Sequence, residues 1–201
     1  MCRYPLFETL AVINGNVMHL QYHQARLEKA CSHYLNGKNT FDLNHIIVVP
    51  KEYQYGLVRC RVDYNLYEYN VRFFSYQPKK IHRYQCVYTE NLDYRYKYSD
   101  RKNIEALKQD NSNEIIIINN GFVSDCTIGN LLFFKKGQWY SPANYLLKGT
   151  QLSYLLTQKL ITLIEIRAED IFSYERIMMI NALNPFDEAR SLPITSGTIM
   201  T

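Results

Sequence analysis

The sequence predicts an α+β protein made of two successive domains. Its 201 residues are 47% hydrophobic, which is enough for one large domain or two small ones. In the first half, apolar side chains recur at helical spacing over residues 21–36, among several strand-like segments. This order is typical of a helix packed on a largely antiparallel sheet. We expect a first domain at residues 1–92, a linker at 93–100 and a second domain at 101–201.

The first domain opens with a predicted β-hairpin. Its arms, LFETLAVI and VMHL, are joined at residues 14–16 by Asn-Gly-Asn, and an Asn-Gly pair tolerates the positive φ angles of tight turns. A helix should follow at residues 21–36, where apolar residues recur every three or four positions. Further strands are expected at residues 46–50, 57–65, 67–76 and 81–89.

The second domain follows a polar, tyrosine-rich stretch between Glu90 and Asp100 that has no clear periodicity. A short helix, RKNIEALKQ, should come first. The β-branched run in EIIIINNGFVSD then predicts a strand covered on both faces. NLLFFKKGQWYSP predicts a hairpin that turns near Lys136 and Gly137. QLSYLLTQKLITLI predicts the clearest helix, and IMMINALNP predicts one more buried strand.

Charge and cysteine content argue against several classes of protein. The net charge of +4 is spread along the chain, so we expect no nucleic-acid partner. Five cysteines without a Cys-x-x-Cys pair cannot all close into internal disulfides, which favours a reducing cytoplasm. The start of the chain lacks a signal-peptide profile, and no apolar run approaches the roughly 18 residues of a membrane helix. We therefore expect a soluble cytoplasmic protein without a membrane partner.

Common nucleotide-binding, nucleophile and metal motifs are missing as well. The chain contains no Gly-x-x-x-x-Gly-Lys, no Gly-x-Gly-x-x-Gly and no Gly-x-Ser-x-Gly. His19 and His23 have a metal-compatible spacing, but His19 belongs to the preceding strand and a third ligand is not nearby, so we expect no metal site. Cys126 follows Asp125 in a turn and has no recognisable His partner, which favours a half-buried thiol over a nucleophile.

Four remaining features together match one chemistry. Lys97 lies at the domain boundary, where clefts form. Asp125 ends a predicted buried strand. Gly149 and Thr150 precede a strong helix whose N–H groups and dipole favour an anion, and Arg26 could add a charge-assisted bond to it. An amine, a carboxylate and a cationic cup are the parts that a pyridoxal phosphate site requires.

In order and wording, these segments resemble the fold-type IV pyridoxal phosphate enzymes, the class IV aminotransferase family. LFETLAVINGNVMHLQYHQARLEKA resembles the family's opening strand, hairpin and His-x-x-Arg-Leu helix, which implies that Arg26 binds the cofactor phosphate. KYSDR is similar to the Lys-x-x-Asn-Arg of the 4-amino-4-deoxychorismate lyase branch. This similarity implies that Lys97 forms the Schiff base and that Arg101 lies near the cofactor hydroxyl. The resemblance runs from Phe7 to about Asn184.

The second half resembles the family's longest signature. In NEIIIINNGFVSDCTIGNLLFFKKGQWYSPANYLLKGT, Asp125 occupies the position whose carboxylate is implied to meet the pyridine nitrogen. Two departures are that the family usually has the longer Glu there, and that Leu152 stands where Arg is frequent. The segments implied to complete the phosphate cup match here at Gly149, Thr150, Gln151, Asn181 and Ala182.

The resemblance has further implications for fold, assembly and activity. It implies a small α+β N-terminal domain and a β-barrel-like C-terminal domain in a homodimer. It also implies a pyridoxal phosphate enzyme that acts on a small-molecule amino substrate, with Lys97 as the general acid-base. KYSDR and ARLEKAC favour 4-amino-4-deoxychorismate lyase, which releases pyruvate and 4-aminobenzoate for folate synthesis. A class IV aminotransferase for branched-chain or D-amino acids is the alternative.

Ordinary structural roles are the competing interpretation. Lys97 and Arg26 could be solvated side chains, Asp125 could bond its own turn, and Gly149 could be a helix cap. Arg101 could pair with Asp100 or Glu105 at a helix start.

Two other classes of function stay open. The Asp125 departure would suit a relative that has lost activity. The tyrosine-rich residues 52–98 would suit a non-catalytic module for single-stranded nucleic acid.

Overall fold

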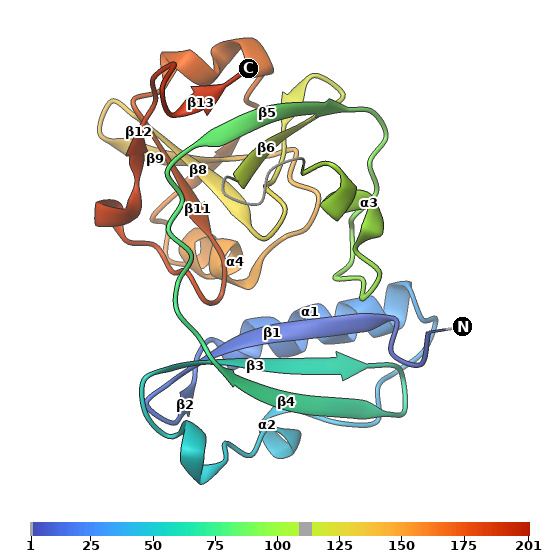
Figure 1. Ribbon diagram of the computed structural model, residues 1–201. Coiled ribbons are helices and arrows are strands. Elements are labelled where there is room, and N and C mark those ends of the chain that lie inside the picture. Colours follow the sequence, from blue (N-terminus) through green and yellow to red (C-terminus); the bar gives the residue numbers. More distant parts are fainter. Residues whose placement is uncertain (1, 109–113) are drawn as a thin grey trace. The chain divides into compact units, whose positions relative to one another are not determined.

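A computed structural model describes residues 2–108 and 114–201 and divides them into two units (Figure 1). The first unit contains residues 2–78 and 96–100. The second contains residues 79–95 and the described residues from 101 onward. Each unit combines β-sheet with helices, so the predicted α+β class is confirmed.

The first unit is an antiparallel sheet with a long helix on one face (Figure 1). The helix is α1 (Leu20–His33), and it packs where Leu10, Leu27 and Val58 share one buried core. The strands, in the sheet order β2-β1-β3-β4, are β1 (Leu6–Ile13), β2 (Asn16–Val17), β3 (Leu57–Tyr64) and β4 (Tyr69–Ser75). The predicted hairpin and first helix are thus confirmed.

No strand forms at residues 46–50, all of which the structure describes, so that prediction is wrong. The chain forms α2 (Leu43–Ile46) and then η1 (Lys51–Tyr53). Asp42 caps α2 by accepting a hydrogen bond from Asn44 N at 2.7 Å. Such a local contact competes with strand pairing. Val48 is accordingly 76% exposed.

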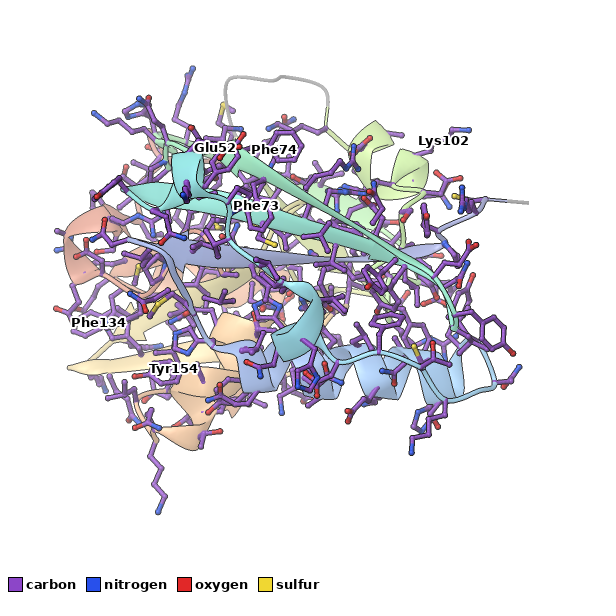
Figure 2. All side chains as sticks on the ribbon, turned by 90° about the horizontal axis from the view of Figure 1, so that it is seen from below. Glu52, Phe73, Phe74, Lys102, Phe134 and Tyr154 are labelled. Atoms are coloured by element: carbon purple, nitrogen blue, oxygen red, sulfur yellow. The ribbon has the colours of Figure 1, made fainter. Side chains whose placement is uncertain are left out.

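The turn η1 packs against the edge strand β4. Tyr53 stacks on Phe73 with 5.7 Å between the ring centres, and Figure 2 shows Phe73 beside the turn that carries Glu52. On the opposite side of the same strand, the Arg59 guanidinium lies 4.5 Å from the ring centre of Phe74. Aromatic packing therefore covers β4 from both directions.

The second unit contains two sheets. The first, in the order β13-β5-β6-β7, consists of β13 (Ile199–Met200), β5 (Tyr84–Thr89), β6 (Glu114–Asn119) and β7 (Phe122–Val123). The second, in the order β10-β9-β8-β11-β12, consists of β10 (Thr162–Ile164), β9 (Gln138–Pro142), β8 (Asn130–Lys135), β11 (Arg176–Ile180) and β12 (Leu192–Pro193). Helical segments lie between successive strands of the same sheet: α3 (Lys102–Ala106) in the first, and α4 (Thr150–Thr157), η2 (Ala168–Ser173) and η3 (Glu188–Arg190) in the second.

The two sheets of this unit share one core, and α4 covers the outside of the second sheet. Ile116 and Ile118 of β6 are buried together with Phe133 of β8. On the other face of β8, Leu132 is buried with Leu152 of α4. Strand β8 is therefore covered on both faces, and its apolar sequence reflects this position.

Strand β5 corrects the expected domain boundary. The sequence places residues 81–89 in the first domain, but β5 pairs in parallel with β6 of the second unit, from Tyr84 opposite Glu114 to Thr89 opposite Asn119. The division thus falls after residue 78, with residues 96–100 returning to the first unit. Strand pairing between distant segments leaves no local signal, which explains the difference.

Two predicted helices are shorter than expected. Helix α4 ends at Thr157, because Lys159 adopts a left-handed φ of 56° and residues 162–164 pair with β9 as strand β10. The β-branched residues there favour a strand. Helix α3 ends at Ala106, and the last residue predicted for it, residue 109, lies outside the described residues. Within residues 2–108 and 114–201, no helix has the length and apolar character that crossing a membrane requires.

Candidate functional site

The predicted site residues form two groups, one in each unit. The first unit contains Lys97 and Arg26. The second unit contains Arg101, Asp125, Gly149, Thr150, Gln151, Asn181 and Ala182.

Lys97 is fixed beside the first strand of its unit by backbone contacts. Phe7 N donates a hydrogen bond to Lys97 O at 3.0 Å, and Leu6 forms an antiparallel bridge with Tyr98. Because paired residues of neighbouring strands point to the same face, the side chains of Lys97 and Phe7 lie together. Lys97 Nζ is 4.8 Å from the centre of the Phe7 ring. The segment is therefore an ordered extension of the sheet, and Lys97 is half-buried.

The tyrosines on both sides of Lys97 anchor this segment to the end of α1. The ring of Tyr34 lies 5.4 Å from that of Tyr96 and 5.2 Å from that of Tyr98, between ring centres. Tyr96 and Tyr98 are 5.9 Å apart. The three rings form one aromatic cluster, which holds the backbone at Lys97 from a second direction.

Arg26 is paired with a buried carboxylate that the sequence interpretation missed. Arg26 Nε donates to Glu8 Oε1 at 2.8 Å, and Arg26 Nη2 donates to Glu8 Oε2 at 2.5 Å. His23, one turn earlier on α1, contributes Nδ1 at 2.7 Å from Glu8 Oε2. Glu8 and His23 are fully buried, whereas the Arg26 side chain is 15% exposed. Arg26 is therefore not simply a solvated helix residue.

Glu8 carries a negative charge although it is buried. Burial raises the pKa of Glu8, but the charge and hydrogen bond of Arg26, together with those of His23, outweigh burial and lower this pKa to about 2. Burial also lowers the pKa of His23. Glu8 raises this pKa through its hydrogen bond and charge, and the positive charges of Arg26 and Lys97 lower it further. Since a carboxylate only accepts hydrogen bonds, His23 carries its proton on Nδ1.

In the second unit, Asp125 is buried and its carboxylate is held by three donors. Oδ1 accepts a hydrogen bond from Asn130 Nδ2 at 2.7 Å. Oδ2 accepts hydrogen bonds from the backbone N–H groups of Leu146 and Leu147, both at 3.0 Å. The short Asp side chain thus reaches the loop before α4, and these charge-assisted bonds fix its orientation.

Asn130 joins Asp125 to the start of α4. Its Nδ2 also donates to Leu147 O at 2.9 Å, and its Oδ1 accepts a hydrogen bond from Gly149 N at 3.1 Å. A Cβ atom on Gly149 would lie only 2.2 Å from this Oδ1, so the contact requires glycine. One hydrogen-bonded chain, Asp125–Asn130–Gly149, therefore brings together residues that lie far apart in the sequence.

The first turn of α4 is buried and begins without a capping side chain. Gly149 is its N-cap, and Ser153 N closes the first turn on Gly149 O at 2.9 Å. Thr150 and Gln151 follow, 4% and 3% exposed. Among the described residues, Gln151 Oε1 is a buried oxygen without a hydrogen-bond partner. A helix start that is enclosed in this way has a positive dipole end at which a negatively charged group is stabilised.

The turn after β11 contacts the same region. Asn181 Oδ1 accepts hydrogen bonds from the backbone N–H groups of Leu183 and Asn184, each at 2.9 Å, and Asn181 Nδ2 donates to Ile128 O at 3.1 Å. Ala182 is half-buried in this turn. Asn181 thereby ties the turn to the loop at residues 126–129, next to Asp125.

Arg101 also binds the loop at residues 126–129. Its Nη2 donates to Thr127 O at 2.8 Å, its Nη1 donates to Tyr94 Oη at 2.7 Å, and its Nε donates to Glu105 Oε1 at 3.0 Å. The interpretation of Arg101 as a helix-start residue paired with Glu105 is confirmed. Its predicted place near a cofactor hydroxyl stays a prediction.

Glu114, another buried carboxylate of the second unit, binds the loop at residues 126–129 through Thr127. Its Oε1 accepts hydrogen bonds from Thr127 Oγ1 at 2.7 Å and from Thr127 N at 3.3 Å. Lys108 Nζ and Lys79 Nζ lie 3.8 and 4.0 Å from Glu114 Oε2, beyond hydrogen-bond distance but within range of an ion pair. Thr127 is therefore held at its side chain and at both backbone groups.

Glu8 could have been found in the sequence, because it breaks a pattern. In LFETLAVI, every second residue points to the same face of the predicted strand. Leu6, Leu10 and Val12 lie on the buried face, and Glu8 lies on that face with them. A charge at a core position is informative, since it requires a partner. Glu114 and Thr127 left no comparable signal, because their partners come from distant segments.

A groove of about 1100 Å³ on the first unit is lined by Gln24, Glu28, Lys38, Asp42 and His45, among others, and includes none of the predicted site residues. Within the part of the chain that the structure describes, no three His, Cys, Asp or Glu side chains lie close enough to hold a metal ion.

Comparisons with known proteins agree with the resemblance. A model of the amino-transferase class IV family matches residues 83–192, more than half of the chain. An uncharacterized protein of Haemophilus influenzae is 41% identical over 186 residues, which covers 90% of this chain and 98% of that protein.

Solved structures with the same fold are described as lyases or aminotransferases of proposed or hypothetical function. A crystal structure of a proposed 4-amino-4-deoxychorismate lyase from Haemophilus somnus 129PT is 40% identical, with a TM-score of 0.86, and the match covers 92% of this chain and all of that one. A hypothetical aminotransferase from Mycobacterium tuberculosis, with α-ketoglutarate and PMP bound, has a TM-score of 0.74 at 15% identity and covers 96% of this chain and 84% of that one. The chain therefore belongs to the class IV aminotransferase family of enzymes.

Proposed function

We propose that this enzyme uses pyridoxal 5'-phosphate and acts on a small-molecule amino substrate as a 4-amino-4-deoxychorismate lyase. The observation that carries the proposal is the hydrogen-bonded chain Asp125–Asn130–Gly149. It couples the carboxylate proposed for the ring nitrogen to the helix start proposed for the phosphate. The related Haemophilus somnus protein, at 40% identity, supports the lyase assignment.

The side chains present suit the cofactor. Asp125 offers an oriented carboxylate. The buried start of α4 offers N–H groups and a positive dipole end. Gln151 Oε1 is a buried acceptor without a partner among the described residues, so it could accept a hydrogen bond from a donor group of a bound molecule. In the first unit, Arg26 offers a guanidinium whose position is fixed by Glu8.

Each residue then has a definite task. When bound, pyridoxal phosphate withdraws electrons from the substrate carbon that loses its proton. Lys97 Nζ would hold the cofactor and, with a substrate bound, would be the base that takes and returns the α-proton. Asp125 holds the proton on the ring nitrogen. The N–H groups at Gly149 and Thr150 would bind the phosphate, and the family resemblance assigns the charge of Arg26 to the same group.

Arg101, Gln151, Asn181 and Ala182 keep supporting tasks in this proposal. Arg101 and Asn181 hold the loop next to Asp125 through Thr127 O and Ile128 O. Gln151 and Ala182 complete the proposed phosphate cup. The assembly is proposed to be a cytoplasmic homodimer without a nucleic-acid partner, and sedimentation of the purified protein would test the dimer.

Cofactor content tests the proposal most directly. The purified protein should be yellow, and borohydride should attach the cofactor covalently to Lys97, as peptide mass analysis would show. Lys97→Ala should abolish this labelling, whereas Lys80→Ala, a change at a lysine outside the site, should not. A wild-type protein that neither binds nor is labelled by pyridoxal phosphate would contradict the assignment.

The substrate is tested separately. Incubation with 4-amino-4-deoxychorismate should release pyruvate and 4-aminobenzoate. Exchange of an amino group with glutamate or with a branched-chain or D-amino acid, without pyruvate release, would instead assign a class IV aminotransferase. The shared fold with the Mycobacterium tuberculosis aminotransferase makes this the alternative to measure.

A further inference from the structure

We propose that Glu8 is a positioning residue that aims Arg26 at the cofactor phosphate, an inference that rests on the function proposed above. Glu8 accepts two hydrogen bonds from Arg26, through Nε at 2.8 Å and Nη2 at 2.5 Å. This side-on pairing uses one edge of the planar guanidinium. The other edge, formed by Nη1 and the second hydrogen of Nη2, points away from Glu8 and has the fork geometry that matches an oxyanion.

The burial of Glu8 makes this pairing obligatory. Glu8 is fully buried, and its pKa of about 2 keeps it ionised throughout the physiological range. A buried carboxylate without its cation is strongly destabilising, so the guanidinium cannot rotate away from Glu8 at little cost. Arg26 is thus confined to one orientation, which it would not have as a solvated helix side chain.

His23 confines Glu8 in turn. Its Nδ1 donates to Glu8 Oε2, the same oxygen that accepts from Arg26 Nη2. Residues 23 and 26 are three apart, so both side chains project from one face of α1 toward β1. The carboxylate is therefore held at three points by two residues of a single helix. The packing of α1 on β1 therefore sets the orientation of the Arg26 edge that is proposed to bind the phosphate.

A comparison of two ligands isolates this role. Pyridoxal phosphate and pyridoxal differ only in the phosphate, so the ratio of their dissociation constants reports the phosphate contact. Glu8→Gln should weaken pyridoxal phosphate binding at least tenfold, about 1.4 kcal/mol, and change pyridoxal binding less than twofold. Absorbance and fluorescence titrations of the refolded, cofactor-free protein measure both constants without reference to activity.

A double-mutant cycle tests whether Glu8 acts through Arg26. In an Arg26→Gln background, Glu8→Gln should cause no further loss of pyridoxal phosphate affinity, and the doubly neutral pair should fold. Glu28→Gln, an exposed change on the same helix, is the matched control and should alter neither ligand. If Glu8→Gln does not fold, Glu8→Asp keeps the charge but withdraws it by one methylene. Glu8→Asp should, like Glu8→Gln, weaken pyridoxal phosphate binding more than pyridoxal binding.

The outcomes separate the two proposals. Equal weakening of both ligands by Glu8→Gln, unchanged pyridoxal phosphate affinity, or an added loss in the Arg26→Gln background would overturn the positioning role. The cofactor assignment would survive each of these results. A wild-type protein that binds neither ligand overturns both proposals.

Discussion

Asn130 binds the carboxylate of Asp125 through Nδ2 at 2.7 Å. Its Oδ1 at the same time accepts the N–H of Gly149 at 3.1 Å. Asn130 is 3% exposed, and its amide donates to one partner and accepts from the other. This amide therefore couples the orientation of a buried carboxylate to the position of the first turn of α4.

Replacing this amide should affect both partners. Asn130→Ala removes the hydrogen bonds to Asp125 and Gly149 and leaves buried polar groups unpaired, so we expect a loss of about 1–3 kcal/mol in unfolding free energy. Pyridoxal phosphate affinity should fall as well, because two proposed contacts shift. Urea unfolding and cofactor titration measure the two effects. Asn70→Ala, an exposed change on β4, should leave both unchanged.

Gly149→Ala should be destabilising for a steric reason alone. The φ of Gly149 is −65°, so alanine meets no backbone strain, but its Cβ would lie 2.2 Å from Asn130 Oδ1. We expect a cost of about 1–3 kcal/mol as the amide or the helix start is displaced. At Gly197 the nearest atom to an added Cβ is Thr195 Oγ1 at 3.7 Å, an ordinary contact. Gly197→Ala should therefore stay within about 0.5 kcal/mol of wild type in thermal unfolding.

The Glu8 cluster should make the protein acid-sensitive. The pKa of Glu8 falls from 4.5 to about 2 on folding, so its stabilisation is present above pH 4.5 and is lost as the pH falls toward 2. This shift corresponds to roughly 3 kcal/mol. The pKa of His23 is also lowered from 6.5, so its protonation costs stability as the pH falls below 6.5. Unfolding free energy should thus decline in two stages.

Glu8→Gln supplies the test of this assignment. The variant lacks the titrating carboxylate, so its stability should fall less steeply than that of wild type between about pH 4.5 and 3, while His23 contributes to the slope of both proteins. Urea unfolding at several pH values follows the slope. An equal slope in both proteins over that interval would show that other carboxylates cause the acid sensitivity.

Arg101 should contribute to stability through Thr127. Arg101→Gln removes donors to Thr127 O and Tyr94 Oη, and the Arg101 side chain is only 17% exposed. We expect a loss of about 1–3 kcal/mol in unfolding free energy. Arg95→Gln, which removes an exposed pair with Asp93, should cost no more than about 1 kcal/mol. Equal, small effects of both changes would argue that Arg101 does not hold the loop.

Several elements that carry the candidate site could be predicted from the sequence because short motifs encode them. Gly149 before an apolar helix and Asp125 after an isoleucine run could be recognised locally. Strand β6 forms where predicted, and α4 begins where predicted but ends earlier. The strand predicted at residues 46–50 failed because the Asp42 cap favours a helix turn there. Strand β5 was assigned to the wrong domain because its partner, β6, begins at Glu114, 30 residues further along the chain from Tyr84.

The sequence by itself determined the α+β class, the family resemblance and the identity of the chemically suited residues. Alternating and helical apolar patterns and a few motif positions encode these features locally. Only the tertiary structure decided that Arg26 is held by Glu8, that Asn130 connects Asp125 to Gly149, and that Lys97 extends the sheet beside β1. These pairings join residues distant in sequence, and burial gives them their strength because buried polar groups must find partners.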